Sequence, residues 1–422
     1  MKSRKTIIRR LVELAELAGL VVLGFLVFLG CSSDEVERPQ QMQQRAVGFS
    51  ARIAESKGDA TRGARTTRTA PEPGDGELTT ALLQTVGFGV YCWYTGSTDV
   101  TFTNAKGTTP SAHISTYTRT LLMQNQRVTY SNSKWDYTPS KYWPLNSSEK
   151  LTFRAYAPYV SYELQTSDEG MPLLPVVVTA DDYKNGSQHD PLWGTSRHEG
   201  TDDEGTTYGT LYNNYTYANS GDHYTDPVGG DARNGFIDWY FHHGMTRLIF
   251  QCFVIQEPGC DSVTIKSITV SDLYTRGLLN ISSPTASSAI TDKPIWTERG
   301  GSMTVNIEED YLAAKPLVIR TDMMPPTVSD TISVLGKGLL IIPRAYNELN
   351  PLTVTITYTI DEDDTELTAE GIINDREFYG NTSYTLNMKL TPTTQGLDIT
   401  LVQSAFTPWK DGGSGTHTVY NW

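Results

Sequence analysis

The most regular feature of this chain is an alternation of apolar and polar side chains, which is the pattern of half-buried β-strands. It is clearest in residues 353–360, where Val354, Ile356, Tyr358 and Ile360 alternate with threonines. Further strands are predicted in residues 86–95, 121–130, 150–157, 175–179, 248–254, 263–270, 366–373, 384–390 and 397–401. Clusters of Gly, Ser, Asn and Pro separate these segments and break any helical period, so the pattern predicts an all-β chain.

The pattern is interrupted at two places that need their own explanation. Between Ile265 and Ile268 the apolar face shifts by one position, which predicts a β-bulge near Lys266. Residues 361–364 are all acidic and join two predicted strands. Four carboxylates could suggest calcium, but the segment lacks the loop length, the central Gly and the terminal Glu of a calcium loop. An exposed hairpin turn is therefore the preferred interpretation.

A single strand is predicted near the start of the chain, in residues 46–53. Its apolar side chains, Val47, Phe49, Ala51 and Ile53, share one face, and Gly, Ser and Arg occupy the other. The pattern then stops, because residues 55–75 contain almost no apolar side chains and cannot bury enough surface to stay ordered. The strand is therefore predicted to be isolated from the rest of the fold by a linker.

The linker carries three arginines at intervals of three residues, Arg62, Arg65 and Arg68. Exposed linkers of this composition are where proteases cut. Two interpretations stay open at this point. The segment is either a flexible loop with scattered charge or a programmed site for an Arg-specific protease.

The first thirty residues have the pattern of an export signal. Residues 17–30 form an apolar run that follows several basic side chains, and at fourteen residues this run is shorter than the ~20 that a membrane-spanning helix needs. Cys31 follows Gly30 directly, and residues 28–31 resemble the lipobox of bacterial lipoproteins. The resemblance implies that the Cys31 sulfur is acylated and becomes the new N-terminus. The alternative is a secreted protein with an incidental cysteine.

Length and charge limit the organisation and the partners. A chain of 422 residues is too long for one average domain, and its tyrosines, glycines and tryptophans suit an all-β composition. We expect a signal peptide in 1–30, a tether with strand and linker in 31–75, and β-sandwich domains in 76–235 and 236–422. The net charge is −14 although the first 68 residues are basic. So acidic a body disfavours nucleic acid and anionic membrane surfaces as partners.

Residues 185–235 differ in composition from the rest, because tyrosines lie among Gly, Asn, Asp and Ser. Such mixtures make adaptable contact surfaces, as an adhesin would need, but they also make ordinary solvated loops, which is the preferred interpretation. The segment also contains histidines and acidic residues, but their spacing matches no metal-ligand motif: His189, His198, His223, Asp202, Asp203 and Glu204.

Candidate chemistry is sparse elsewhere. Cys92 lies on the apolar face of its predicted strand and is interpreted as a small buried hydrophobe. Cys252 and Cys260 flank a turn, and whether they pair in an oxidising periplasm stays open. The chain has no HExxH, GxSxG or phosphate-loop motif. We therefore predict no enzyme activity, no cofactor and no metal.

Several short motifs, in their order and spacing, resemble the fimbrillin family of Bacteroidetes, the Mfa-like and FimA-like pilus subunits. The resemblance extends over residues 47–409, nearly the whole exported chain. It rests on Tyr142-Trp143-Pro144, residues 153–158, Asp190-Pro-Leu-Trp193, residues 243–248, Ile341-Ile-Pro343, residues 380–390 and Trp409. The resemblance implies two tandem transthyretin-like Greek-key β-sandwiches.

The resemblance also implies an assembly route. A lipidated precursor reaches the outer membrane, an Arg-specific protease cuts after Arg62, Arg65 or Arg68 and removes the first strand, and the vacated groove accepts a strand from a neighbouring subunit. That donor strand would come from residues 397–422, with Leu397, Ile399, Leu401 and Trp409 as candidates. The expected partners are other pilus subunits, the protease and the outer membrane, and the expected final location is the fimbrium. The alternative is a permanently anchored surface lipoprotein, a pilus anchor or tip adhesin that binds glycan or a host protein.

Overall fold

The computed structural model describes residues 45–53, 78, 80–97, 120–167, 171–184, 189–201, 207–210, 214–220, 235–254, 257–281, 295–307, 317–320, 332–403 and 418–419. These residues all belong to one compact unit, residues 45–422. Their regular elements are β-strands and two short helices, α3 (Thr80–Val86) and α5 (Ala180–Lys184). No helix within the described ranges is long and apolar enough to cross a membrane.

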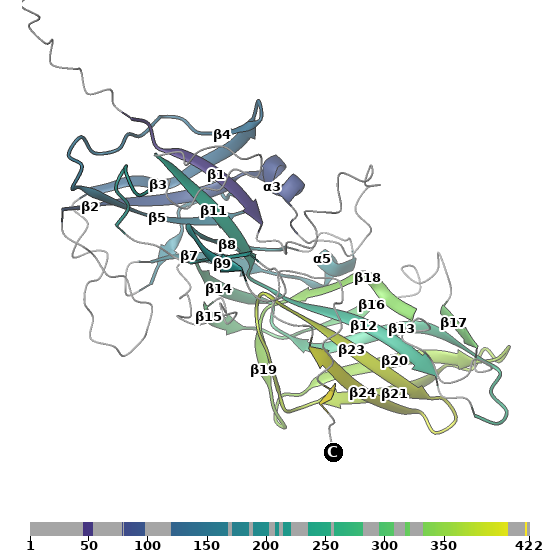
Figure 1. Cartoon of the computed structure of the whole chain (residues 1–422). Helices are drawn as coiled ribbons and strands as arrows, with labels where there is room; N and C mark the ends of the chain where they lie inside the picture. Colours follow the sequence, from purple (N-terminus) through teal and green to yellow (C-terminus); the bar gives the residue numbers. More distant parts are fainter. Residues whose placement is uncertain are drawn as a thin grey trace, which may run out of the picture. The chain divides into compact units, whose positions relative to one another are not determined.

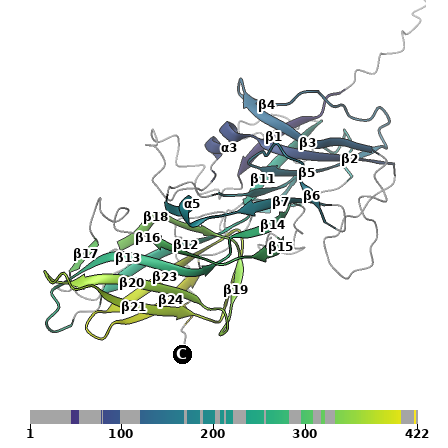
Figure 2. The ribbon, with the colours of Figure 1, turned by 180° about the vertical axis from the view of Figure 1, so that it is seen from behind.

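The first sheet has seven strands and curls around its own apolar core. Its order is β1 (Gly48–Ile53), β11 (Phe236–His243), β8 (Leu192–Thr195), β5 (Lys150–Ala157), β2 (Phe88–Gly96), β3 (Thr120–Ser131) and β4 (Lys134–Asp136). Figures 1 and 2 show β1 beside β11 from both sides. The order begins with β1 and ends with β4, and Phe49 of β1 contacts Tyr137, just beyond β4, with ring centroids 5.3 Å apart. The two edges of the sheet therefore meet.

The second sheet follows a ten-strand path. Eight strands run in the order β16 (Met303–Ile307), β13 (Ser262–Leu273), β20 (Leu352–Ile360), β21 (Leu367–Ile373), β24 (Gly396–Gln403), β23 (Thr382–Thr391), β12 (Thr246–Val254) and β18 (Ile332–Ile341). β17 (Leu317–Arg320) pairs with β13, and β25 (Thr418–Val419) pairs with β24. Only the pair Glu370 and Gly396 joins β21 to β24. The path thus has two halves, and their apolar side chains share one core.

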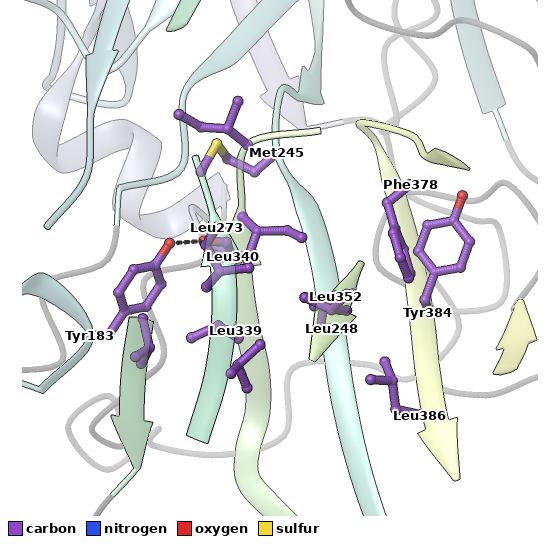
Figure 3. Packing of buried hydrophobic residues seen from close by; sticks show 14 of the residues in the cluster. Tyr183, Met245, Leu248, Leu273, Leu339, Leu340, Leu352, Phe378, Tyr384 and Leu386 are labelled. Carbon is purple, nitrogen blue, oxygen red and sulfur yellow. Dashed lines mark hydrogen bonds between the residues drawn. The ribbon is translucent and has the colours of Figure 1, made fainter. Parts of the chain in front are cut away.

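The core of this second region is closely packed. Figure 3 shows Leu248 and Leu386, from neighbouring strands, with Phe378 and Tyr384, whose rings meet edge to face at 4.7 Å. Tyr183 of α5 donates its hydroxyl hydrogen to the Leu340 carbonyl oxygen at 2.6 Å. Its hydroxyl is therefore paired although the ring is buried.

A smaller sheet combines strands from the two halves of the sequence. Its order is β15 (Ile295–Gly300), β14 (Arg276–Asn280), β7 (Pro172–Val177) and β6 (Gln165–Thr166). Two-stranded pairs complete the described ladders: β9 (Arg197–Thr201) with β10 (Thr207–Thr210), and β19 (Arg344–Tyr346) with β22 (Arg376–Phe378). Since β7 and β14 pair along their length, the first and second halves of the chain share backbone hydrogen bonds.

The turn from β11 to β12 connects the first sheet to the second. Gly244 N donates to Pro191 O at 2.7 Å, and Trp296 Nε1 donates to Gly244 O at 2.8 Å. His243 Nδ1 lies 2.7 Å from Asp190 Oδ2, with both side chains buried. Two of the sequence motifs, residues 190–193 and 243–248, therefore meet at this turn.

The predicted all-β fold with two successive sandwich-type bodies is confirmed. The register of β13 on β20 shifts between Ile265 and Ser267, which confirms the predicted bulge. β20 and β21 pair antiparallel across the acidic turn, and Asp361 Oδ1 there accepts hydrogen bonds from Asp261 N and Ser262 N at 2.8 and 2.7 Å. The two strands therefore form a hairpin across the acidic turn, as the sequence predicted.

The boundary between the domains needs revision. The sequence placed Phe236 at the start of the C-terminal domain, whereas β11 pairs with β8 and β1 in the first sheet. Because β12 pairs instead with β18 and β23 of the second sheet, we propose the boundary at Gly244.

The buried His242 generates a prediction on pH dependence. Its ring stacks on Trp193 with centroids 4.9 Å apart, and burial lowers its pKa to about 3. The unfolded chain takes up a proton below the ordinary histidine pKa of about 6.5, but the folded chain does not, so stability falls as the pH falls through that value. Between pH 7.5 and 5.5 this group should remove about 1.4 kcal/mol of unfolding free energy.

Urea unfolding of His242→Gln at both pH values checks this, because the variant should lose that much less stability than the unaltered chain. His189→Gln is the matched control, since the His189 side chain is exposed. An unchanged pH dependence in His242→Gln would contradict the assignment.

Candidate functional site

The candidate site is the position of the first strand, β1. Within the described residues it forms one edge of the seven-stranded sheet and pairs in parallel with β11, from Gly48 opposite Phe236 to Ile53 opposite Phe241. A Cβ atom on Gly48 would lie 2.6 Å from the Phe236 ring, so any side chain there would have to displace that ring. From residue 48 onward, β11 is the strand that shares a ladder with β1.

The apolar face of β1 fills the interior of the curled sheet. Val47, Phe49 and Ile53 are 2%, 3% and 5% exposed, and Ala51 is half-buried. The Phe49 ring meets the rings of Phe88 and Phe153 edge to face, at 6.2 and 6.1 Å. These contacts come from β2 and β5, so β1 side chains reach across the core to strands with which β1 shares no ladder.

The start of β1 is held on its other side by residues 137–143. Val47 N donates to Lys141 O, and Trp143 N donates to Arg45 O, both at 2.9 Å. The Tyr137 hydroxyl donates to Val47 O at 2.9 Å. The first residues of the strand therefore close the curled sheet, while its remainder shares a ladder with β11 alone, and Ile53 N donates to Thr80 Oγ1 at 3.3 Å.

The polar face of β1 carries an ion pair. Arg52 Nη2 lies 2.7 Å from Asp238 Oδ2 and donates to the Tyr240 hydroxyl oxygen at 2.7 Å, and the guanidinium lies 4.6 Å from the centroid of the Tyr240 ring. The Ser50 hydroxyl donates to the other carboxylate oxygen, Asp238 Oδ1. Burial, and then the Asp238 charge, raise the pKa of Tyr240, so its hydroxyl stays protonated.

This arrangement can bind an extended segment. It offers apolar pockets at alternate positions, a ladder on β11 that β1 occupies, and one buried acid, which are the requirements of strand addition. The described residues contain no group of three potential metal ligands. The geometry is that of a strand-binding groove that the chain's own first strand occupies.

The predicted site residues divide into three sets. Phe49, Ala51 and Ile53 lie in β1, Val47 directly precedes it, and all four side chains belong to the first core or pack against it. A second set lies outside the described residues: Cys31, Arg62, Arg65, Arg68 and Trp409. The third set is Leu397, Ile399 and Leu401, which lie in β24 and pair there with β23.

The position of β24 in the second sheet argues against residues 397–401 as the donor strand. Leu397 is buried and Ile399 packs against the second core, so releasing them would open that core. Within the predicted range 397–422, we therefore propose residues 404–422 as the donor. β25, inside that range, pairs with β24 at Thr418 and Val419.

The remaining candidate residues from the sequence are the cysteines, the Tyr-rich segment and the possible metal ligands. Cys92, Cys252 and Cys260 are buried free thiols, and burial raises the pKa of the Cys252 thiol to about 12. Within the Tyr-rich segment, Tyr215 is buried and donates its hydroxyl hydrogen to Ser196 O, and the Tyr217 ring packs on Trp143. These two tyrosines stabilise the fold rather than form a contact surface. Of the histidines and acids considered as metal ligands, His223, Asp202, Asp203 and Glu204 lie outside the described residues.

Sequence reasoning missed the residues that surround β1. Tyr137 and Trp143 bond its start, and Asp238 and Tyr240 bond its polar face. Asp238 had a detectable signal, because it is the lone charge within the apolar run of residues 236–241. Its partner Arg52 is likewise the lone charge of its strand. Neither signal identifies the other without the fold.

Comparison with known proteins gives concordant results. A family model described as fimbrillin-like matches residues 83–409. Fimbrium subunit Fim1C of Phocaeicola vulgatus is 29% identical over 155 residues, which cover 36% of this chain and 34% of that protein. The match thus spans about a third of the length of that relative.

The fold is similar to that in the crystal structure of a fimbrial protein from Bacteroides vulgatus. The TM-score is 0.51 at 15% sequence identity, and the alignment covers 86% of this chain and 100% of that one. At this identity the likeness concerns the fold alone.

The packing of Phe49 generates a prediction. Phe49→Ala should lower the free energy of unfolding by about 3 to 5 kcal/mol, because it empties a pocket lined by aromatic rings. Urea unfolding measures the loss. Leu349→Ala is the control, since that side chain is 89% exposed and should cost little. A loss no larger than that of the control would show that β1 is not a core element.

Proposed function

The chain belongs to the fimbrillin-like family, and we propose that it is a structural subunit of a cell-surface pilus that assembles by exchange of its first strand. The observation that carries this proposal is the position of β1. It fills the core of the first sheet, yet it is an edge strand joined to the remainder of the chain through the Arg-containing linker.

The energetics favour replacement over an empty groove. Removing Val47, Phe49 and Ile53 from the core costs roughly 5 to 9 kcal/mol, at about 1.5 to 3 kcal/mol for each large side chain. That loss is comparable with the net stability of a domain, about 5 to 15 kcal/mol. A cleaved subunit is therefore stable only when another strand occupies the groove.

The open edge of β11 supplies the affinity for the replacement. Its backbone N–H and C=O groups form a ladder with an added strand, and alternate side chains of that strand enter the pockets of Val47, Phe49 and Ile53. When each subunit gives a strand to the next and receives one from the previous, the contact does not close on itself. It therefore grows a filament.

The processing steps complete the proposal. Acylation of Cys31 anchors the precursor in the outer membrane, an Arg-specific protease cuts after Arg62, Arg65 or Arg68, and the processed subunit joins the fimbrium. Residues 404–422 of a neighbouring subunit are the proposed donor. A pilus anchor or tip adhesin with the same fold would keep its first strand, so cleavage separates the two functions.

Cleavage and assembly are tested together. An Arg-specific protease should cut the purified full chain first between Arg62 and Arg68, after which SDS-resistant multimers should form, because the released strand vacates the groove. N-terminal sequencing and unboiled gels measure both steps. A triple variant with Lys at all three positions keeps the charge and should remain an uncut monomer. A cut chain that stays monomeric would exclude the stalk role.

Anchoring is tested separately. Cys31→Ser should move the protein from the membrane fraction to the supernatant, because acylation requires the thiol. Ser32→Ala, one position further, is the control and should remain with the membranes. Retention of Cys31→Ser in the membrane fraction would refute the lipid anchor.

A further inference from the structure

The outward, polar face of β1 contacts Asp238 and Tyr240 through hydrogen bonds, which its apolar face does not make. Asp238 follows Ile237 and precedes Trp239, whose side chains lie in the core, so its carboxylate projects from the opposite face of the sheet. The side chain is only 7% exposed, and each of its two oxygens accepts a hydrogen bond from β1, one from Ser50 and one from Arg52.

The Arg52 site suits a guanidinium in particular. One terminal nitrogen contacts both the Asp238 carboxylate and the Tyr240 hydroxyl, and the planar group lies over the Tyr240 ring. Arginine stacks on aromatic rings and pairs with carboxylates better than lysine does. The side chain is 33% exposed, so its stem covers Asp238 while one side of it faces water.

Removing β1 withdraws the two partners that Asp238 has on that strand, and the Tyr240 hydroxyl remains beside the carboxylate. While the groove is empty, water can reach the carboxylate from the vacated edge. A replacement strand then buries it again, and burial of a carboxylate without a cation carries a large desolvation cost. The cost therefore arises at the moment of strand addition and depends on the sequence of the incoming strand.

We propose that Asp238 is a specificity determinant of the groove, which selects an incoming strand with a basic residue on its outward face beside Tyr240. This inference rests on the proposed function, because it requires that β1 be replaceable. The occupant is an extended segment of a pilus subunit with apolar side chains at alternate positions. Between two of them it has Arg or Lys at the place of Arg52, and a hydroxyl residue at the place of Ser50 strengthens the match.

A strand with a basic residue at this place is the favoured occupant, because its charge is complementary to that of the poorly exposed Asp238 carboxylate. A strand with a neutral residue at that place could fill the apolar pockets equally well and would still leave the buried Asp238 carboxylate without a cation. Unpaired buried groups discriminate more strongly than differences in apolar volume do. Within the proposed donor range of this chain, residues 404–422, the basic side chains are Lys410 and His417. Lys410 follows the aromatic Trp409 and is the candidate if the donor is a second copy.

The experiment uses the full chain cut in its linker by an Arg-specific protease. A fluorescent peptide of residues 45–54, present in excess during the cut so that it competes with self-assembly, is the probe, and peptides that carry Arg52→Met or Val47→Ala compete with it for the groove. The Arg52→Met peptide keeps the length of the side chain and removes its charge. It should bind about thirtyfold more weakly than the unaltered peptide, as expected when a buried charge pair loses one partner.

The Asp238→Asn protein tests whether the Asp238 charge causes the difference in affinity between the peptides. On that protein the discrimination between the Arg and Met peptides should largely disappear, whereas Val47→Ala should weaken binding to both proteins equally. The comparison of peptides on the unaltered protein stands on its own should Asp238→Asn fold poorly. Equal binding of the Arg and Met peptides to the unaltered protein would overturn the inference and leave strand exchange intact.

Two further outcomes are informative. A peptide of residues 404–422 that binds, and that loses affinity on Lys410→Gln, would support the inference with a second copy as the occupant. If no peptide displaces the bound strand after the linker is cut, the groove does not exchange, and both this inference and the proposed function fail.

Discussion

The structure of the first sheet depends on its closure by β1. A curled sheet whose interior is filled by aromatic rings has two edges to bring together, and here the first strand joins β11 at one edge to residues 137–143 at the other. Phe49 lies at that junction, in contact with rings from β2, from β5 and from the segment after β4. One short segment therefore both closes the first sheet and fills its core. Such a segment cannot be lost without a substitute, and its place at an edge means that the substitution breaks no central ladder.

The second sheet is organised in a different way and has no comparable strand within the described residues. Its path is interrupted at a single weak link, the pair Glu370 and Gly396, and its two halves pack their apolar faces together. β24 is held by β23 along its length, so it is fixed by both ladder and core. The contrast supports the start of the chain as the place of the proposed strand exchange. The mixed sheet of β7 and β14 and the turn at Gly244 then couple the first sheet to the second.

Much of this fold could be predicted from local pattern. The period of two identified most of the long strands, and the phase shift at Lys266 located a bulge, because side-chain alternation directly reports which face is buried. Pairing partners could not be predicted in this way, since β1 bonds to a strand almost two hundred residues later in the sequence. The same limit explains the domain boundary: β11 has the pattern of any buried strand, and only its partners place it in the first sheet. It also explains the donor candidates, because residues 397–401 read as an apolar strand whether they are fixed or free.

In the candidate site, polar contacts to Asp238 and Tyr240 can distinguish strand directions that the apolar pockets do not distinguish. Alternating side chains fit a groove in either chain direction, because a period of two is unchanged by reversal. The outward face does not have this symmetry. In the parallel arrangement Ser50 lies opposite Asp238 and Arg52 opposite Tyr240, so the hydroxyl comes two residues before the cation. A strand that entered antiparallel would need the cation first to reach the same partners. In the proposed exchange, the Asp238 carboxylate beside Tyr240 would therefore favour both a basic residue in the incoming strand and the parallel direction. The apolar pockets set only the alternation, so in this proposal Asp238 and Tyr240 are the residues that distinguish one strand, in one orientation, from others of equal hydrophobicity.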